Sequence, residues 1–219
     1  HYDGVRWRNT ATPTSADLFG VWGSSAAGVF AVGAQGTILR WDGRSWRTMV
    51  SGTTDDLCDI WGSSRDDIYA IGSDSTMLHF DGTRWKHVQA PFTSFAAQIW
   101  GSSAHDVYIA AGDGLFHLDG FAWRAMPVGA GGNVRAVWGR APDDVFASTG
   151  NGSSIYHFDG VDWLPQYELS GSPRNLSDIG GAIGGPAVAV AYPSQGALAS
   201  PNFGRLSDGA PPLLLELGG

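Results

Sequence analysis

The sequence contains a single cysteine, Cys58, among its 219 residues. One thiol cannot form a disulfide within the chain, so the cysteine count says nothing about the redox compartment. Clusters of cysteine and histidine with the spacing of a zinc site are also lacking, and no cofactor or metal is expected. Cys58 lies in an apolar stretch, and we expect its side chain to be buried.

Positive charge is scarce as well. There are 13 Lys and Arg residues against 21 Asp and Glu, a formal net charge of −8, and Lys86 is the only lysine. Proteins that bind nucleic acid need clustered Lys and Arg to neutralise phosphates, so nucleic acid is not an expected partner. No apolar run approaches the ~20 residues of a membrane helix, so membrane insertion is not expected. His1 begins no basic and then apolar signal sequence, although a leader could have been removed.

What the sequence does contain is glycine, 32 residues, and two motifs that recur every 38 to 40 residues. The first motif is Trp-Gly, which occurs at Trp22, Trp61, Trp100 and Trp138. The second is Asp-Gly, then two variable residues, then Trp, which occurs at Asp3/Trp7, Asp42/Trp46, Asp81/Trp85, Asp119/Trp123 and Asp159/Trp163. Such a constant period indicates a repeat architecture.

Each unit divides into four short strands. In the clearest copy, residues 57–61, 68–71, 77–80 and 85–88 read as strands, and Asp81-Gly82 supplies the hairpin turn before the fourth. Four strands every ~40 residues are typical of β-propeller blades. The sequence therefore predicts one all-β domain over residues 1–219. Its repeats are expected at about 17–50, 56–89, 95–128 and 133–167, with a composite unit made of 175–200 plus 1–10.

The composite unit predicts ring closure. His1 to Trp7 matches His79 to Trp85, and Leu176 to Gly181 aligns with Leu57 to Gly62, so the two ends of the chain supply complementary halves of one blade. We expect a five-bladed propeller closed by pairing the N-terminal strands with the C-terminal blade, with a third strand near 196–199. A linear solenoid would instead leave two ends that need caps. Residues 201–219 have no counterpart and form an extra strand or a tail.

The motifs carry a family resemblance. Trp61-Gly62-Ser63-Ser64, the strand Asp67 to Gly72 and His79-Phe80-Asp81-Gly82 with Trp85 resemble the repeats of bacterial propellers of the Asp-box and WD/YVTN-type families, over residues 1 to about 165. This resemblance implies a bacterial protein that is extracytoplasmic or secreted. Five short blades are also similar in architecture to the tachylectin-type lectins, which implies carbohydrate binding once per blade.

Two sets of polar residues are candidates for a site. Asp59, Gln98, Arg135 and Asp178 lie in the first strands, which should surround the central channel, where they could hold a ligand or simply contact water. A basic residue recurs two positions before the Asp-Gly turn, at His1, Arg40, His79, His117 and His157. Equivalent positions lie on separate blades and cannot converge on one ion, so a hydrogen bond within each blade is the better interpretation.

Acidic residues before the second strand, at Asp66-Asp67, Asp106 and Asp143-Asp144, could suggest glycosidase carboxylates. Capping of turn amides explains them fully, so we expect a structural role. The repeated tryptophans, and Asp42, Asp81, Asp119 and Asp159 in the turns, are expected to be structural.

The function predicted first is therefore non-catalytic recognition of a glycan through repeated sites between blades. A protein-interaction scaffold that uses one face of the propeller is the alternative, and a glycosidase or sialidase is the third possibility. Sugar sites should recur at each blade with an exposed aromatic side chain, whereas a protein site should be one patch.

Overall fold

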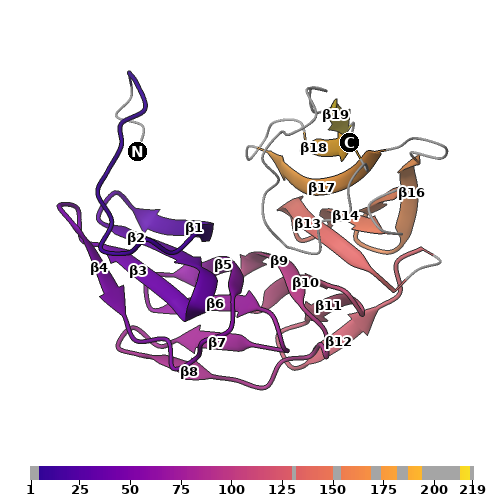
Figure 1. Cartoon of the computed structure of the whole chain (residues 1–219). Coiled ribbons are helices and arrows are strands. Elements are labelled where there is room, and N and C mark those ends of the chain that lie inside the picture. The colour runs from indigo at the N-terminus through magenta and orange to yellow at the C-terminus, as the bar shows by residue number, and fades with distance from the viewer. Residues whose placement is uncertain are drawn as a thin grey trace.

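The computed structural model of the chain describes residues 5–129, 132–149, 154–168, 174–181, 187–193 and 213–217. These residues form strands and one short 3-10 turn, and the strands are organised in five antiparallel sheets. Figure 1 shows the sheets following one another along an arc in chain order. No helix in this part of the chain has the length and apolar character needed to cross a membrane.

The first four sheets have four strands each. The first sheet comprises β1 (Leu18–Ser25), β2 (Gly28–Gly33), the turn η1 (Ala34–Gly36), β3 (Thr37–Trp41) and β4 (Trp46–Met49). The second comprises β5 (Leu57–Ser64), β6 (Asp67–Gly72), β7 (Met77–Phe80) and β8 (Trp85–His87). The third comprises β9 (Ala96–Ser103), β10 (Asp106–Ala111), β11 (Gly114–Leu118) and β12 (Trp123–Met126). The fourth comprises β13 (Val134–Ala141), β14 (Asp144–Thr149), β15 (Ser154–Phe158) and β16 (Trp163–Glu168).

The fifth sheet has three described strands, β17 (Arg174–Gly181), β18 (Ala187–Pro193) and β19 (Leu213–Leu217). β18 pairs with β17 along one edge and with β19 along the other. A strand can pair along only two edges, so β19 occupies the edge of β18 at which we expected a third strand from residues near 196–199. The segment 196–199 itself lies outside the described residues.

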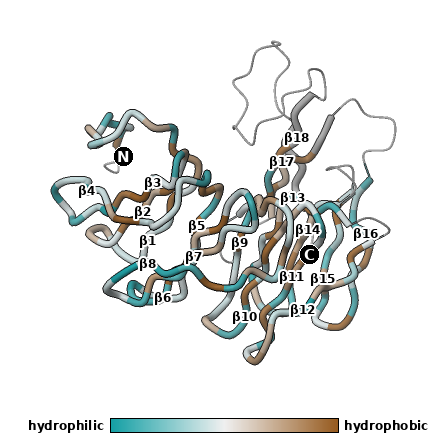
Figure 2. Tube along the Cα trace, turned by 60° about the horizontal axis from the view of Figure 1, so that its bottom comes forward, coloured by the Kyte–Doolittle hydropathy of each residue, from teal (hydrophilic) through white to brown (hydrophobic). Residues whose placement is uncertain are grey.

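The sheets pack face to face, which explains why their second strands are apolar without alternation. In β10, five consecutive residues from Val107 to Ala111 are buried, because a neighbouring sheet covers each face. One apolar cluster joins Phe30 and Val32 of the first sheet to Ile60 and Ile68 of the second, and similar clusters fill the next three spaces between sheets. Figure 2 shows hydrophobic segments along these strands and hydrophilic ones at many of the turns.

The Asp-Gly turns between the third and fourth strands are built alike in the four complete sheets. In the first, Asp42 Oδ1 accepts hydrogen bonds from the backbone N–H groups of Arg44 and Ser45, both at 2.9 Å. Gly43 has a φ of 92°, which favours glycine. The aspartates at 81, 119 and 159 accept the same pair of bonds. The turn motif read from the sequence is thus a side-chain cap on a tight hairpin.

Ring closure through the N-terminus is not confirmed. Residues 1–4 lie outside the described residues, and Figures 1 and 2 both place the described N-terminal segment away from β17 and β18. The inner strands contact one another in succession, β1 with β5, β5 with β9, β9 with β13 and β13 with β17. The first and fifth sheets therefore lie at the two ends of the arc.

Candidate functional site

The inner strands bring three of the four predicted channel residues together. Gln98 Nε2 donates a hydrogen bond to Asp178 Oδ1 at 2.8 Å, although the two residues are 80 positions apart. Gln98 Oε1 accepts a bond from the backbone N–H of Val137 at 2.8 Å, and Asp59 Oδ2 accepts one from the N–H of Ile99 at 2.9 Å. We call Asp59, Gln98 and Asp178 the inner-strand network. Its bonds join the second sheet to the third, and the third to both the fourth and the fifth.

Arg135, the fourth residue of the predicted set, forms no described hydrogen bond with the inner-strand network. Asp59 and Gln98 each lie two residues before the tryptophan of their strand, and the residue at that place in β13 is Ala136. Arg135 itself lies at an irregularity in the pairing of β13 with β14, between Val134 and Ala136. It is exposed, and none of the hydrogen bonds among the described inner strands involves its side chain.

Burial shifts the acidity of both carboxyl groups. Desolvation raises the pKa of Asp59 to about 7, and the negative charge of Asp178 adds to the shift, while hydrogen bonds from the N–H groups of Ile99 and Ile60 oppose it. Desolvation also raises the pKa of Asp178, against the bond from Gln98. In the first sheet, Gly20 occupies the equivalent position, and a Cβ there would lie 3.1 Å from Asp59 Oδ1. That glycine therefore leaves room for the Asp59 carboxyl.

A second arrangement recurs in three sheets and joins the second strand to the third. A histidine of the third strand bonds an aspartate at the start of the second strand, with Nε2 to Oδ1 distances of 2.7, 2.7 and 2.8 Å for His79–Asp67, His117–Asp106 and His157–Asp144. Each histidine ring stacks on an aromatic ring, namely Tyr69, Tyr108 or Phe146. We call these the His-Asp pairs. The hydrogen bond expected within each unit is present in these three sheets.

The serines beside the His-Asp pairs contact the aspartate in their described hydrogen bonds. Ser63 and Ser102 donate their hydroxyl hydrogen bonds to Asp67 and Asp106, so the carboxylate lies between the serine and the histidine. Nucleophilic catalysis requires the opposite order, with the histidine touching the hydroxyl. In the fourth sheet, Arg140 takes the place of the serine and forms an ion pair with Asp144. The capping of turn amides expected for these aspartates is not among the described hydrogen bonds of Asp67 and Asp106, which accept bonds from side chains.

The first sheet replaces both members of the pair. Arg40 stands where the other sheets have histidine, with its guanidinium carbon 5.4 Å from the centre of the Phe30 ring. Gly28 stands where they have aspartate, since it pairs with Ser25 as Asp67 pairs with Ser64. His1, the fifth basic residue of the predicted series, lies outside the described residues. Within the described part of the chain, no group of three or more His, Cys, Asp or Glu residues could hold a metal ion.

The tryptophans of the inner strands connect neighbouring sheets. A Cβ added to Gly62 would lie 2.9 Å from Trp22 of the preceding sheet, and the corresponding distances are 2.8 Å from Gly101 to Trp61 and 2.6 Å from Gly139 to Trp100. Trp61-Gly62 and Trp100-Gly101 thus each supply a ring to the next sheet and a glycine that receives the ring of the previous one. Trp85, Trp123 and Trp163 of the fourth strands pack into the same apolar clusters.

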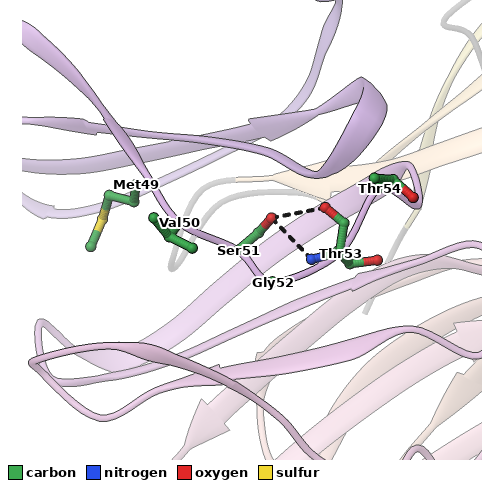
Figure 3. A pocket seen from close by; sticks show the side chains of 6 residues that line it. All are labelled: Met49, Val50, Ser51, Gly52, Thr53 and Thr54. Carbon is green, nitrogen blue, oxygen red and sulfur yellow. Dashed lines mark hydrogen bonds between the residues drawn. The ribbon is translucent and has the colours of Figure 1, made fainter.

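A depression of about 540 Å³ lies on the connection from β4 to β5 and is lined by Met49, Val50, Ser51, Gly52, Thr53 and Thr54. Figure 3 shows the Ser51 hydroxyl bonded to the backbone of Thr53, as donor to the carbonyl at 3.2 Å and as acceptor from the N–H at 3.4 Å. Sequence reasoning did not identify this depression, because connecting segments vary most between the units and carry no repeated motif.

No family model and no curated protein matches this sequence. Solved structures do match it. A structure of YCF48 bound to D1 peptide superposes with a TM-score of 0.64 and 18% identity, over 86% of this chain and 64% of that chain. YCF48 from Cyanidioschyzon merolae gives a TM-score of 0.61 and 16% identity, over 82% of this chain and 65% of that chain.

The chain has a β-propeller fold. Identities of 16 and 18% establish the likeness of fold alone. This chain spans less than two thirds of the length of either YCF48 structure. The propeller predicted from the repeat period is confirmed at the level of all-β architecture with four-stranded antiparallel blades.

Proposed function

We propose that this propeller is a non-catalytic recognition module that binds a polypeptide segment of a partner protein. The observation that carries the proposal is the likeness to a propeller whose structure includes a bound peptide, YCF48 with D1 peptide. The geometry of the His-Asp pairs agrees with a protein that does no chemistry, because neither Ser63 nor Ser102 touches a histidine in its described hydrogen bonds.

Carbohydrate recognition, the first hypothesis from the sequence, has less support. Repeated sugar sites require an exposed aromatic side chain at equivalent places in successive blades. Two of the described aromatic side chains are strongly exposed, Phe121 and Trp7. The first, second and fourth sheets have Arg44, Thr83 and Val161 at the place of Phe121. The tryptophans at the place of Trp7 are buried or half-buried in the four complete sheets. Neither exposed aromatic therefore recurs as such among the described blades, which favours the protein-interaction alternative.

One edge of the propeller has the charge pattern of a protein contact. We call it the connector edge: the described links between successive sheets, 50–56, 88–95 and 127–133 without 130–131, and the turns 34–36, 73–76 and 112–113. These described residues include four aspartates and no Lys or Arg, with the aspartates at 55, 56, 74 and 113. Complementary charge steers association and selects partners, so we propose a partner segment that carries Lys or Arg.

The aspartates of this edge also fix its shape. Asp56 Oδ1 accepts a bond from the N–H of Gln35 at 2.9 Å, and Asp55 accepts one from the Thr76 hydroxyl at 2.5 Å. Asp113 accepts bonds from Thr93 and Ser94 in the next connection. A surface held in this way loses little conformational entropy when a segment binds to it.

Two matched substitutions test the proposal. Val50 is 88% exposed in the depression on the connector edge, and Phe121 is 94% exposed at the opposite edge, because β12 runs from that turn toward the connections. The purified chain and its Val50→Arg and Phe121→Arg variants would be applied to an array of 15-residue peptides and to a glycan array. We expect peptides rich in Lys or Arg to bind, with at least tenfold weaker binding to Val50→Arg, because the added positive charge repels them, and unchanged binding to Phe121→Arg.

Binding of these peptides should also weaken as salt is raised from 50 to 500 mM, because exposed charges are then screened. Equal loss in both variants, or binding that salt does not change, would remove the connector edge from the proposal. Binding of glycans with no peptide bound would restore the carbohydrate hypothesis in its place.

A further inference from the structure

The inner strand of the first sheet is exposed at positions that the other sheets bury. Val21 is 69% exposed, whereas the residues at its place in the other inner strands are 0 to 4% exposed: Ile60, Ile99, Val137 and Ile179. Leu18 is 38% exposed, against 0 or 1% for its equivalents Leu57, Ala96, Val134 and Leu176. Two apolar side chains of β1 therefore lack the cover that their equivalents have.

Gly23 belongs to the same surface. An atom of the preceding sheet's tryptophan is among the three atoms nearest to an added Cβ at its equivalents Gly62, Gly101 and Gly139. The three atoms nearest to a Cβ on Gly23 belong instead to β2 of its own sheet, and Gly23 is exposed. We call Leu18, Val21 and Gly23 the open face of β1. It has the composition of the surfaces that receive a tryptophan elsewhere in the molecule.

An exposed tryptophan lies at the same end of the molecule. Trp7 is 80% exposed and Val5 is 85% exposed, in the segment 5–10 that precedes β1 in the chain. Each of the other nine tryptophans is buried or half-buried. Figure 1 shows this segment extending from the first sheet, at the end of the arc where β1 lies. Because Val21 is exposed as well, the segment does not cover the open face of its own chain.

The segment differs in charge from the rest of the chain. Residues 5–10 include Arg6 and Arg8 and no acidic residue, whereas the whole chain has a formal net charge of −8. Asp17, which is exposed, stands directly before Leu18 at the open face. Complementary charges guide association and fix the register of a contact. A second copy of the chain can thus bring both an indole ring and basic side chains to the open face.

The fifth sheet offers less to this surface. Its inner strand has Gly180 where the other inner strands have tryptophan. Nothing lies within 4 Å of the place where a Cβ on Gly180 would stand. The fifth sheet therefore has no ring at this place to set on Gly23, whereas the segment 5–10 of a second copy has one.

We propose that the open face of β1 is an interaction surface for a second copy of the chain, with Trp7 of each copy lying on Val21 and Gly23 of the other. Donor and receiver lie at the same end of each chain, so one twofold axis relates two equivalent contacts and the assembly closes as a dimer. Few side chains take part, so the dimer is weak and dissociates on dilution. The proposal does not depend on what the connector edge binds.

The first experiment measures self-association by sedimentation equilibrium at protein concentrations from about 5 to 500 µM. We expect the wild-type chain to dimerise over this range, and Trp7→Ala and Val21→Arg each to weaken dimerisation at least tenfold. The matched control is Val161→Arg, because Val161 is 81% exposed in a turn of the fourth sheet and the charge change is the same. This control should dimerise as the wild-type chain does. A wild-type chain that stays monomeric overturns the proposal, and so does a dimer that neither Trp7→Ala nor Val21→Arg weakens.

Mixing the two weakened variants tests whether the contact is reciprocal. The Val21→Arg chain retains Trp7, and the Trp7→Ala chain retains an intact open face, so a mixed dimer keeps one of the two contacts. We expect the mixture to associate at least fivefold more tightly than either variant alone. No gain on mixing would mean that Trp7 does not lie on the open face of the other copy, which overturns the proposal.

Labelling of a Val21→Cys variant with a maleimide at pH 7.5 gives an independent measurement. Cys58 serves as an internal control, because it is buried and desolvation raises the pKa of its thiol to about 11, which keeps the thiolate scarce. We expect labelling at position 21 to slow at least threefold between 5 and 500 µM protein, and Trp7→Ala to abolish this slowing.

Two other results of the labelling experiment would overturn the proposal. Protection that is the same at every concentration would mean that the chain covers its own open face, as in a closed ring. Rapid labelling at every concentration would mean that no second copy lies there.

Discussion

At the scale of single residues, the inner-strand network shows a conflict between burial and charge. The Asp59 carboxyl is half-buried and accepts a hydrogen bond from a backbone N–H of the next sheet. Burial and Asp178 together hold its pKa near 7, well above that of an exposed aspartate. The folded chain therefore binds a proton at this residue that the unfolded chain has already released, over the interval from about pH 4 to pH 7.

This difference predicts a loss of stability as the pH rises. Where the native state binds more protons than the unfolded state, the free energy of unfolding falls with increasing pH. Asn at position 59 cannot ionise and can still accept the bond from Ile99. We expect Asp59→Asn to match the wild-type chain at pH 4.5 and to be more stable at pH 8, by on the order of 2 kcal/mol, because water reaches part of the side chain. Urea unfolding at the two pH values measures the free energy of unfolding of both proteins. An equal difference between the wild-type chain and the variant at pH 4.5 and pH 8 would contradict the prediction.

The His-Asp pairs make a second prediction at this scale. The first sheet has Gly28 and Arg40 where the others have aspartate and histidine, which indicates that the two positions depend on each other. Removing Asp106 alone leaves half-buried His117 without its hydrogen-bond acceptor, at a cost of about 1 to 3 kcal/mol. We expect Asp106→Gly to be less stable than the double variant Asp106→Gly/His117→Arg, since arginine can lie over Tyr108 as Arg40 lies over Phe30. Thermal unfolding of the wild-type chain, these two variants and His117→Arg alone forms a double-mutant cycle. If the stability losses of the two single variants add up to that of the double variant, the two positions are independent.

At the scale of strands and turns, the sequence predicts most where its local chemistry is strongest. The Asp-Gly turns were identified because an aspartate cap and a glycine with positive φ are a local requirement, as at Asp42 and Gly43. The first strands were predicted too short: β5 continues through Gly62 to Ser64 by way of a bulge, which the sequence does not reveal.

Elements that depend on distant partners could not be predicted in the same way. The third strand of the fifth sheet is β19, which follows β18 after a long intervening segment and shares no motif with the other third strands. The bond from Gln98 to Asp178 crosses from the third sheet to the fifth, so that spacing within one repeat could not show it. Arg135 was grouped with these residues because it lies in an inner strand, although the residue in β13 that stands at the place of Asp59 and Gln98 is Ala136.

The Trp-Gly motif gives a prediction at the scale of elements. A Cβ on Gly139 would lie 2.6 Å from Trp100 and 2.9 Å from the carbonyl oxygen of Asp144, so the sheets must separate or the ring must move. Overpacking of this kind costs about 1 to 3 kcal/mol. Gly23→Ala is the matched control, because the three atoms nearest to a Cβ on Gly23 belong to Val29 and Gly28 of its own sheet. We expect chemical denaturation to show a clearly larger loss for Gly139→Ala, and equal losses would mean that the contact with Trp100 has no special importance.

At the scale of the whole molecule, the arrangement in an arc gives the sheets unequal surroundings. The second, third and fourth sheets each have a neighbour on both faces, whereas the first and fifth lie at the ends. In a structure built from repeats, stability depends on the interfaces that each unit makes with its neighbours. Sheets with one interface should therefore open locally at a lower free energy than sheets with two.

Amide hydrogen exchange tests this inequality directly. The second strands of the second, third and fourth sheets are β6, β10 and β14. Their amides should exchange at least tenfold more slowly than those of β2 and β18, because the opening of these sheets disrupts two apolar clusters rather than one. Since the five strands have similar hydrogen-bond patterns, the difference reports packing between sheets. Equal protection of β2 and β10 would show that the first sheet is covered in solution, which only closure of the ring or association of chains can produce. Repeating the measurement over a hundredfold range of protein concentration separates these two causes, because association alone depends on concentration.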